Sequence, residues 1–352
     1  MNQQTKYWNV DNIVDGLEDY PQIQEAAELL RRNELIAFPT ETVYGLGGNG
    51  MEDETVEKIY TAKGRPSDNP LILHIADRMQ LDELVSEVPP LGEALMEAFW
   101  PGPLTLVFPK KSGVAMRASA GLDTVAIRMP DHPLALALIQ AARLPIAAPS
   151  ANLSGRPSPT TAQHVLEDLD GRIAGVLDGG PTGIGVESTV VDITGDVPMI
   201  LRPGGITAEQ IAEITGEVAI DPGILSEEAA PKSPGMKYRH YAPQGQMWLV
   251  CGDTIEEMTK SICNAARRAI EEGKKVGILA TKETFREYDG DYTVITCGER
   301  RDLISVARRL YDVLRQFDQE SVDVIFAETF PEGGVGTAIM NRLTKAAGGH
   351  YL

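Results

Sequence analysis

The stretch that decides the fold is TVAIRMPDHPLALALIQAARLPIAAPS, residues 124–150. Its first residues form an apolar run typical of a buried strand, its middle has apolar residues at helical spacing, and PIAAPS indicates a second strand. Strand and helix signals alternate in this way from residue 21 to residue 216. The alternation predicts an α/β fold. Its strands are too short and numerous for a simple doubly wound sheet, so we expect mixed strand directions.

A proline-rich break and a simpler pattern follow this region. Residues 222–245 carry four prolines and lose their periodicity, which predicts a linker. From residue 246 onward, four strand-then-helix units predict a small parallel, Rossmann-like domain. Its first strand is not followed by G-x-G-x-x-G, which counts against dinucleotide binding. We therefore predict a first domain at 1–221, a linker at 222–245 and a second domain at 246–352.

The composition narrows the class of protein. The formal net charge is −19, and residues 1–245 contribute −16, from 34 acidic and 18 basic residues. Broad binding of nucleic-acid backbones would need a basic face instead. The chain starts without the apolar core of a signal peptide, and no apolar run approaches a membrane span. The three cysteines are far apart, which indicates reduced thiols. We expect a cytoplasmic protein without membrane association, and an acidic total still permits a small anionic ligand.

Two clusters near the start of the chain could bind such a ligand. FPTETVYGLGGNG, residues 38–50, combines threonine hydroxyls with glycines that let backbone N–H groups approach a ligand, although a plain glycine-rich turn is the simpler interpretation. In AKGRPSDNPLILHI, residues 62–75, Lys63 and Arg65 suit phosphates as a point charge and a planar fork. The alternative is that these cations only stabilise a helix end.

Arg128 lies in the apolar strand TVAIRMP. An arginine between apolar neighbours usually has an anionic partner, and both a protein carboxylate and a ligand remain open as that partner. The next strand runs into APSANLSGRPSPT, residues 148–160, and such junctions in α/β proteins bind ligands. The alternative is a serine-rich loop that enters a helix at Thr160 or Thr161 as a cap.

Two further clusters lie at predicted strand ends. GVESTVVDI, residues 185–193, places Ser188 at the start of a strand, and ILRPGG, residues 200–205, places Arg202 at the end of one. The motifs of Walker ATPases, zinc hydrolases and serine hydrolases, G-x-x-x-x-G-K-[ST], H-E-x-x-H and G-x-S-x-G, are absent from the sequence. The residues alone therefore indicate an α/β protein that binds a small anionic ligand, with a nucleotide favoured.

The ordered motifs PTETVYGL, KGRP, NPLILHI, WPGPLTLV, AIRMP, APSAN, GVEST and LRPG closely resemble those of the threonylcarbamoyl-AMP synthase family. Its catalytic module is the YrdC-like domain. SPGMKYRHYAP and the terminal GGVGTAIMNRLTKAAG are similar to the longer, two-domain form. The resemblance implies a twisted, open sheet with a concave, positively charged cavity. It also implies formation of L-threonylcarbamoyladenylate and pyrophosphate from L-threonine, bicarbonate and ATP, for modification of tRNA at adenosine 37 by a partner enzyme.

The resemblance also implies roles for the clustered residues. By similarity, Lys63 and Arg65 are the catalytic cations that neutralise the ATP phosphates. The nucleotide would also contact Asn69, Thr124, Ser150, Asn152, Ser158, Arg202 and Tyr241. Threonine would contact Thr42, His74, Arg128, the Ala148 backbone and Ser188. Mg²⁺ is expected with ATP, and no acidic cluster in the sequence marks its protein ligands.

Two rival functions fit this sequence less well. Hydrogenase-maturation proteins use a YrdC-like module for carbamoyl transfer, but they carry zinc-finger cysteines and an acylphosphatase-like domain that this sequence lacks. A non-catalytic RNA-binding module would need a basic surface, so we expect no stable direct binding of nucleic acid.

The segment SPGMKYRHYAP, residues 233–243, is unusually basic and aromatic for a spacer. We predict that it is a lid over the catalytic cavity, with Tyr241 as its contact to the nucleotide. The alternative is a linker whose rings pack on the second domain.

Overall fold

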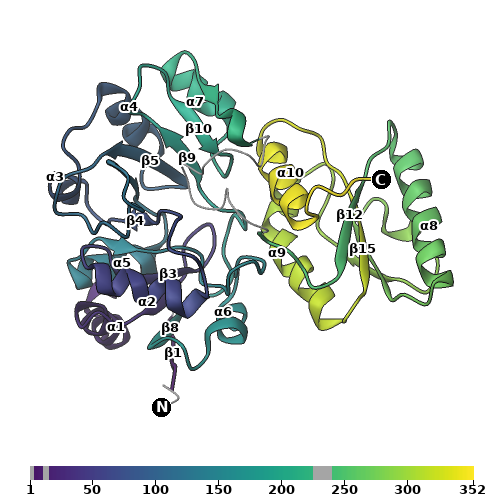
Figure 1. Cartoon of the computed structure of the whole chain (residues 1–352), viewed down its shortest axis with the longest axis horizontal. Coiled ribbons are helices and arrows are strands. Elements are labelled where there is room, and N and C mark those ends of the chain that lie inside the picture. Colours follow the sequence, from purple (N-terminus) through teal and green to yellow (C-terminus); the bar gives the residue numbers. More distant parts are fainter. Residues whose placement is uncertain (1–3, 11–15, 225–239) are drawn as a thin grey trace. The chain divides into compact units, whose positions relative to one another are not determined.

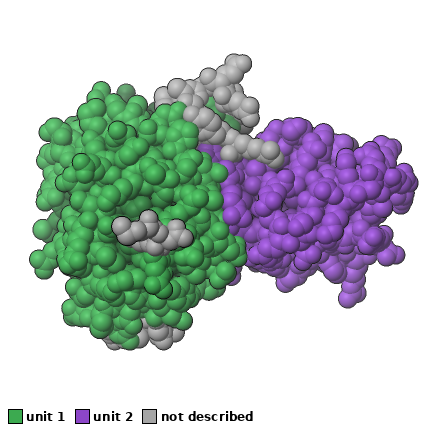
Figure 2. Space-filling view, turned by 60° about the horizontal axis from the view of Figure 1, so that its bottom comes forward, with its two compact units in different colours: residues 1–154, 158–183, 187–237 green, residues 155–157, 184–186, 238–352 purple. Residues whose placement is uncertain are grey.

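The computed structural model describes residues 4–10, 16–224 and 240–352. The chain divides into two compact units, neither of which is contiguous in sequence (Figure 2). Unit 1 comprises residues 1–154, 158–183 and 187–237, and unit 2 comprises residues 155–157, 184–186 and 238–352. Most of the predicted lid, residues 233–239, lies outside the described residues.

The described part of unit 1 contains one sheet of eleven strands, in the order β1-β8-β2-β3-β7-β4-β6-β5-β9-β10-β11. The strands are β1 (Lys6–Asn9), β2 (Ile36–Phe38), β3 (Gly45–Asn49), β4 (Ile72–His74), β5 (Leu104–Pro109), β6 (Thr124–Arg128), β7 (Ile146–Ala147), β8 (Gly175–Asp178), β9 (Thr189–Asp192), β10 (Met199–Arg202) and β11 (Ala219–Ile220). Parallel and antiparallel pairs occur together, for example β4 with β6 and β5 with β6. The prediction of an α/β fold with mixed strand directions is therefore confirmed.

Helices of unit 1 begin where the sequence offers start signals. Proline occupies the first turn of α1 (Pro21–Arg31), α4 (Pro90–Phe99) and α5 (Pro133–Ala142), where its missing N–H has no helical partner to lose. Thr161 caps α6 (Ala162–Leu169) by accepting a hydrogen bond from the His164 N–H, as described in the alternative interpretation of the serine-rich loop. The helices are α1 (Pro21–Arg31), α2 (Asp53–Lys63), α3 (Leu81–Leu84), α4 (Pro90–Phe99), α5 (Pro133–Ala142), α6 (Ala162–Leu169) and α7 (Ala208–Thr215), with short 3₁₀ turns η1 (Leu17–Asp19), η2 (Arg78–Gln80) and η3 (Pro222–Ile224).

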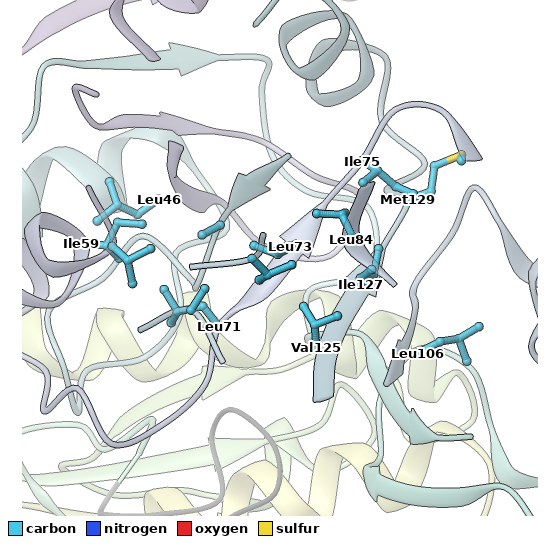
Figure 3. Packing of buried hydrophobic residues seen from close by; sticks show 14 of the residues in the cluster. Leu46, Ile59, Leu71, Leu73, Ile75, Leu84, Leu106, Val125, Ile127 and Met129 are labelled. Carbon is cyan, nitrogen blue, oxygen red and sulfur yellow. The ribbon is translucent and has the colours of Figure 1, made fainter. Parts of the chain in front are cut away.

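The sheet separates two of the hydrophobic clusters of unit 1. Ala37 belongs to one cluster, while its neighbours Ile36 and Phe38 belong to the other, as expected for side chains that alternate along a strand. Figure 3 shows the larger cluster, in which Leu73 of β4 and Ile127 of β6 lie close together. These buried apolar faces hold the ends of β4 and β6 in place, and the candidate site is built at those ends.

The glycine-rich stretch after PTET is a strand, so the interpretation as a turn is wrong. Residues Gly45–Asn49 form β3, which pairs with β2 and β7. A Cβ atom on Gly47 would lie 2.7 Å from Phe38, and one on Gly48 would lie 2.8 Å from Thr55. The glycines are needed because neighbouring side chains pack directly onto this strand.

Unit 2 contains a parallel four-stranded sheet in the order β12-β15-β13-β14. Figure 1 shows α8 (Ile255–Glu271) on one side of this sheet and α9 (Leu303–Gln319) and α10 (Val335–Ala346) on the other, as in a Rossmann-like arrangement. The elements are β12 (Gln246–Val250), α8 (Ile255–Glu271), β13 (Val276–Ala280), the 3₁₀ turn η4 (Phe285–Glu287), β14 (Thr293–Thr296), α9 (Leu303–Gln319), β15 (Val324–Glu328) and α10 (Val335–Ala346). The predicted parallel domain is confirmed. Among the described residues, no helix is both long enough and apolar enough to cross a membrane.

Two short segments from early in the chain belong to unit 2. The carbonyl of Pro157 accepts a hydrogen bond of 2.6 Å from Nη2 of Arg315, which is 1% exposed. A Cβ atom on Gly185 would lie 2.4 Å from the Arg308 Cα, so the backbone of 184–186 packs tightly against α9.

Candidate functional site

Four predicted site residues lie at one edge of the large sheet. β4 and β6 are parallel and place His74 beside Arg128 at their carboxyl ends. β5 is antiparallel to β6 and therefore starts at this edge, as does β9, which is parallel to β5. Ser188 directly precedes β9, and Arg202 ends β10, which is antiparallel to β9. The topology thus brings together His74, Arg128, Ser188 and Arg202, each at most 4% exposed.

Arg128 is held by three groups of unit 1. Its Nε donates to the Gly102 carbonyl at 3.2 Å, and its Nη1 donates to Oγ1 of Thr42 at 2.9 Å. Its Nη2 lies 2.6 Å from Oε1 of Glu41, and the two side chains are 4% and 12% exposed. The anionic partner that the sequence left open is therefore a protein carboxylate in the described chain.

Glu41 is held in position by a turn built on Thr40. Oγ1 of Thr40 donates to the Val43 carbonyl at 2.7 Å and accepts from the N–H groups of Thr42 and Val43. It also lies 2.8 Å from Oγ1 of Thr42. The PTET sequence therefore supplies both a hydroxyl and a carboxylate to Arg128 from one turn.

Two histidines near this ion pair are neutral at pH 7. Burial, together with the positive charge of Arg128, lowers the pKa of His74 to about 3. Burial lowers the pKa of His132 to about 4, against the opposing attraction of the Glu41 carboxylate. Both imidazoles can thus offer hydrogen bonds, but they add no charge to the site.

Arg202 and Ser188 form a second buried cluster. The guanidinium of Arg202 donates to the Ser188 carbonyl from Nε at 3.1 Å and from Nη2 at 3.0 Å. Oγ of Ser188 lies 2.7 Å from Oγ1 of Thr105 on β5. A Cβ atom on Gly204 would lie 2.3 Å from the Glu187 carbonyl oxygen, so this turn requires glycine at that position.

Lys63 ends α2 and is only 3% exposed. Its Nζ donates to the carbonyls of Ser150 at 2.5 Å and Asn152 at 2.7 Å. Oγ of Ser150 in turn donates to Oδ1 of Asn152 at 2.6 Å. The structure therefore joins three of the predicted nucleotide contacts through one buried ammonium group, which a solvated helix end would not do.

Three further residues predicted to contact the nucleotide, Asn69, Ser158 and Arg65, differ in their contacts. Asn69 is 1% exposed, and neither atom of its side-chain amide has a hydrogen-bond partner in the described chain. Oγ of Ser158 donates to Oε1 of Glu187 at 2.6 Å. The Arg65 guanidinium lies 6.0 Å from the centre of the Tyr60 ring.

Thr124 begins β6 and is half-buried. The N–H of Ala148 donates to the Ile72 carbonyl at 3.0 Å, so its predicted contact with threonine would use its own carbonyl oxygen.

Tyr241 lies in unit 2 and is 5% exposed. Its ring stacks on Tyr311 with a centroid distance of 5.3 Å, and the Arg342 guanidinium lies 5.6 Å from its centre. This packing is the one described for the alternative, in which the rings of the segment pack on the second domain. The contact of Tyr241 with a nucleotide stays a prediction.

Three residues beside the predicted ones were not identified from the sequence: the mostly buried Glu41 and the buried His132 and Glu187. Glu41 and Glu187 stand inside the recognised motifs PTET and GVEST. Since acidic side chains are almost never fully buried without partners, a glutamate inside an otherwise uncharged motif was the available signal. His132 directly precedes α5 and carries no comparable signal.

Comparisons with known proteins agree over both units. Residues 28–204 match a family model described as "Telomere recombination", and residues 206–348 match one described as "Threonylcarbamoyl-AMP synthase, C-terminal domain". The chain is 56% identical to a threonylcarbamoyl-AMP synthase of Bacillus subtilis, with 99% of each chain covered. It is 48% identical to the protein of that name from Pyrococcus abyssi, with 96% of this chain and 97% of the relative covered. The crystal structure of P. abyssi Sua5 with L-threonine superposes with a TM-score of 0.92 at 47% identity, covering 99% of each chain. The chain therefore belongs to the threonylcarbamoyl-AMP synthase family, in its two-domain form.

Proposed function

We propose that this protein is an L-threonylcarbamoyladenylate synthase, a nucleotidyltransferase that forms threonylcarbamoyl-AMP and pyrophosphate from L-threonine, bicarbonate and ATP. The observation that carries the proposal is the buried Arg128 with Thr42 and His74 beside it, in a chain whose fold matches a relative crystallised with L-threonine. The names of the relatives support the same activity.

The chemistry needs positioning and charge neutralisation more than covalent work by the protein. The threonine amine attacks bicarbonate to give a carbamate and water. A carbamate oxygen then attacks the α-phosphorus of ATP, and pyrophosphate leaves. Lys63, Arg65 and Arg202 would neutralise the phosphates, since preorganised cations stabilise charge that develops in the transition state.

Threonine would bind at the edge of the sheet. Arg128 would fork its carboxylate, because a guanidinium matches that planar group with two parallel hydrogen bonds. Thr42, Ser188 and the neutral His74 would supply hydrogen bonds to the remaining polar atoms, together with the Ala148 carbonyl. The nucleotide would contact Asn69, Thr124, Ser150, Asn152, Ser158 and Tyr241. The orphaned amide of Asn69 supports this, because a buried amide needs partners that a nucleotide can supply.

Mg²⁺ would arrive with ATP. This ion keeps several of its waters and is usually held by one or two carboxylates together with substrate phosphates. Groups of three or more His, Cys, Asp or Glu side chains suited to a metal do not occur among the described residues. We therefore assign the ion to the triphosphate, where it would neutralise part of the negative charge. Lys63, Arg65 and Arg202 would neutralise the remaining charge of the phosphates.

The product would pass to the enzyme that transfers threonylcarbamoyl to tRNA, since a mixed anhydride with AMP is an activated acyl donor. We place the reaction in the cytoplasm and expect no stable direct binding of tRNA by this chain.

The proposed activity is tested by measuring pyrophosphate release. Wild-type protein should release pyrophosphate from ATP only when L-threonine and bicarbonate are both present. Equal release without threonine would show that the chain is an ATP pyrophosphatase instead, and would end the assignment.

A further inference from the structure

Arg128, the residue proposed to bind the carboxylate of threonine, forms an ion pair with Glu41. Nη2 of Arg128 lies 2.6 Å from Oε1 of Glu41, and both side chains are almost completely buried. Both carboxylate oxygens of Glu41 are inaccessible to solvent, and no donor in the described chain reaches either of them with hydrogen-bond geometry. The contact with Arg128 is therefore ionic, and Glu41 has unused capacity to accept hydrogen bonds.

A substrate that takes Arg128 away from Glu41 changes the charge balance of the site. In the described chain, Arg128 is the one cationic side chain paired with Glu41, and the nearby His132 is neutral. A ligand that brings only a carboxylate would leave Glu41 as a buried carboxylate without a counter-ion, which is strongly unfavourable. A ligand that also brings a positive charge avoids this penalty.

We propose that Glu41 binds the ammonium group of an α-amino acid zwitterion while Arg128 binds its carboxylate. The proposal rests on the proposed function and adds a residue that selects the class of substrate. The zwitterion opens one ion pair and replaces it with two, so the net charge of the site stays the same.

The dimensions of an amino acid suit this exchange. Its nitrogen and carboxyl carbon are both bonded to Cα and lie about 2.5 Å apart. Once the side chains of Glu41 and Arg128 have rotated apart, the amino acid fits between them. Charge-assisted hydrogen bonds of about 2.7–2.9 Å would join its ammonium to Glu41 and its carboxylate to Arg128. Glu41 and Thr42 belong to the same turn. This turn therefore places the carboxylate proposed to bind the ammonium next to the Thr42 hydroxyl, which accepts a hydrogen bond from Arg128.

A simpler account treats Glu41 only as a stand-in that neutralises Arg128 until a ligand arrives. The two accounts differ in what happens when Glu41 loses its charge. A pure stand-in competes with every carboxylate ligand equally, so its removal strengthens all of them by the same factor. A residue that binds the ammonium favours threonine over an analogue that lacks this group.

The test compares L-threonine with (R)-3-hydroxybutyrate, which is L-threonine with hydrogen in place of the amino group. Dissociation constants are measured by calorimetry without ATP and bicarbonate, for wild type, Glu41→Gln and the control Glu57→Gln. Glu57 pairs with Arg117 on the surface of the same unit. Wild type and the control should prefer threonine by about 100-fold or more. In Glu41→Gln the preference should fall below about 10-fold, through weaker binding of threonine and stronger binding of the analogue.

A preference of 100-fold in Glu41→Gln, or one below about 10-fold in wild type, overturns the inference. If Glu41→Gln does not fold, a crystal structure of wild type with L-threonine decides, because it should place a Glu41 oxygen within about 3.2 Å of the threonine nitrogen. A distance above about 4 Å would reject the contact. Pyrophosphate release by the same wild-type preparation separates the two proposals: its absence refutes the function, whereas its presence with an unchanged preference in Glu41→Gln refutes only the role of Glu41.

Discussion

Replacing Arg128 with methionine should destabilise unit 1, because the change removes the counter-ion of a buried carboxylate. The side chains of Arg128 and Glu41 are 4% and 12% exposed, and removing one partner of such a pair costs about 3–5 kcal/mol. The pair of Arg117 and Glu57 is a matched comparison, since both of its side chains are 48% exposed. Arg117→Met should cost only about 0–1 kcal/mol.

Urea unfolding followed by tryptophan fluorescence measures these losses if the signal comes from unit 1 alone. Trp8 and Trp100 belong to unit 1, whereas Trp248 belongs to unit 2. Each arginine variant is therefore made in a Trp248→Phe background. The shift in the midpoint, multiplied by an unchanged slope of the unfolding free energy against urea, gives the destabilisation.

A double variant tests the cause of the loss. Adding Glu41→Gln to Arg128→Met removes the orphaned charge and should restore at least about 2 kcal/mol, because neutral replacement of a buried pair is often tolerated. A cost of less than about 1 kcal/mol for Arg128→Met, or a double variant no more stable than Arg128→Met alone, would refute this role of the ion pair.

Other perturbations test the remaining parts of the site. Lys63→Met should lower pyrophosphate release by about 100-fold or more, whereas Lys58→Met, on the exposed face of the same helix, should leave the rate within about twofold. Gly204→Ala should cost about 1–3 kcal/mol in urea unfolding, because the added methyl meets backbone atoms that cannot move aside. His74 and His132 have folded-state pKa values of about 3 and about 4, below the unfolded value of 6.5. The unfolded chain therefore binds more protons, and stability should fall as pH is lowered from about 6.5 towards 4, by up to about 1.4 kcal/mol per pH unit for each histidine. Unfolding free energies that are equal at pH 7 and pH 5 would contradict this.

Local patterns predicted the elements of the fold better than their arrangement. The apolar runs that became β4, β6 and β10 and the proline that starts α5 are signals within a few residues of one another. The position of β1 at the edge of the sheet, paired with β8, depends on residues far apart in the chain. The glycines of β3 were misjudged for the same reason, because the side chains that require them come from other elements.

In the site, too, the residue types could be predicted from the sequence, whereas the groups that they contact could not. Their positive charge in an acidic chain was enough to make Lys63, Arg128 and Arg202 candidates for binding an anionic ligand. Their partners could not be read from spacing, because Lys63 meets the carbonyls of a loop that follows β7. Every residue has a backbone carbonyl, so the identity of a residue does not show whether its carbonyl binds a lysine. This contact therefore had no signal in the sequence.

Arg128 shows why a protein partner and a ligand partner need not exclude each other. A buried guanidinium requires an anion at all times, because its charge is as costly to desolvate before the ligand binds as afterwards. A site that releases its substrate must therefore contain an anion of its own, and this anion must find a new partner when the substrate returns. Glu41 meets the first requirement, because its carboxylate is paired with Arg128. An amino acid that carries its own ammonium group meets the second, whereas a simple carboxylate does not. A buried arginine in an apolar strand of a candidate ligand site thus predicts a carboxylate nearby, and the charge of that carboxylate restricts which ligands can displace it.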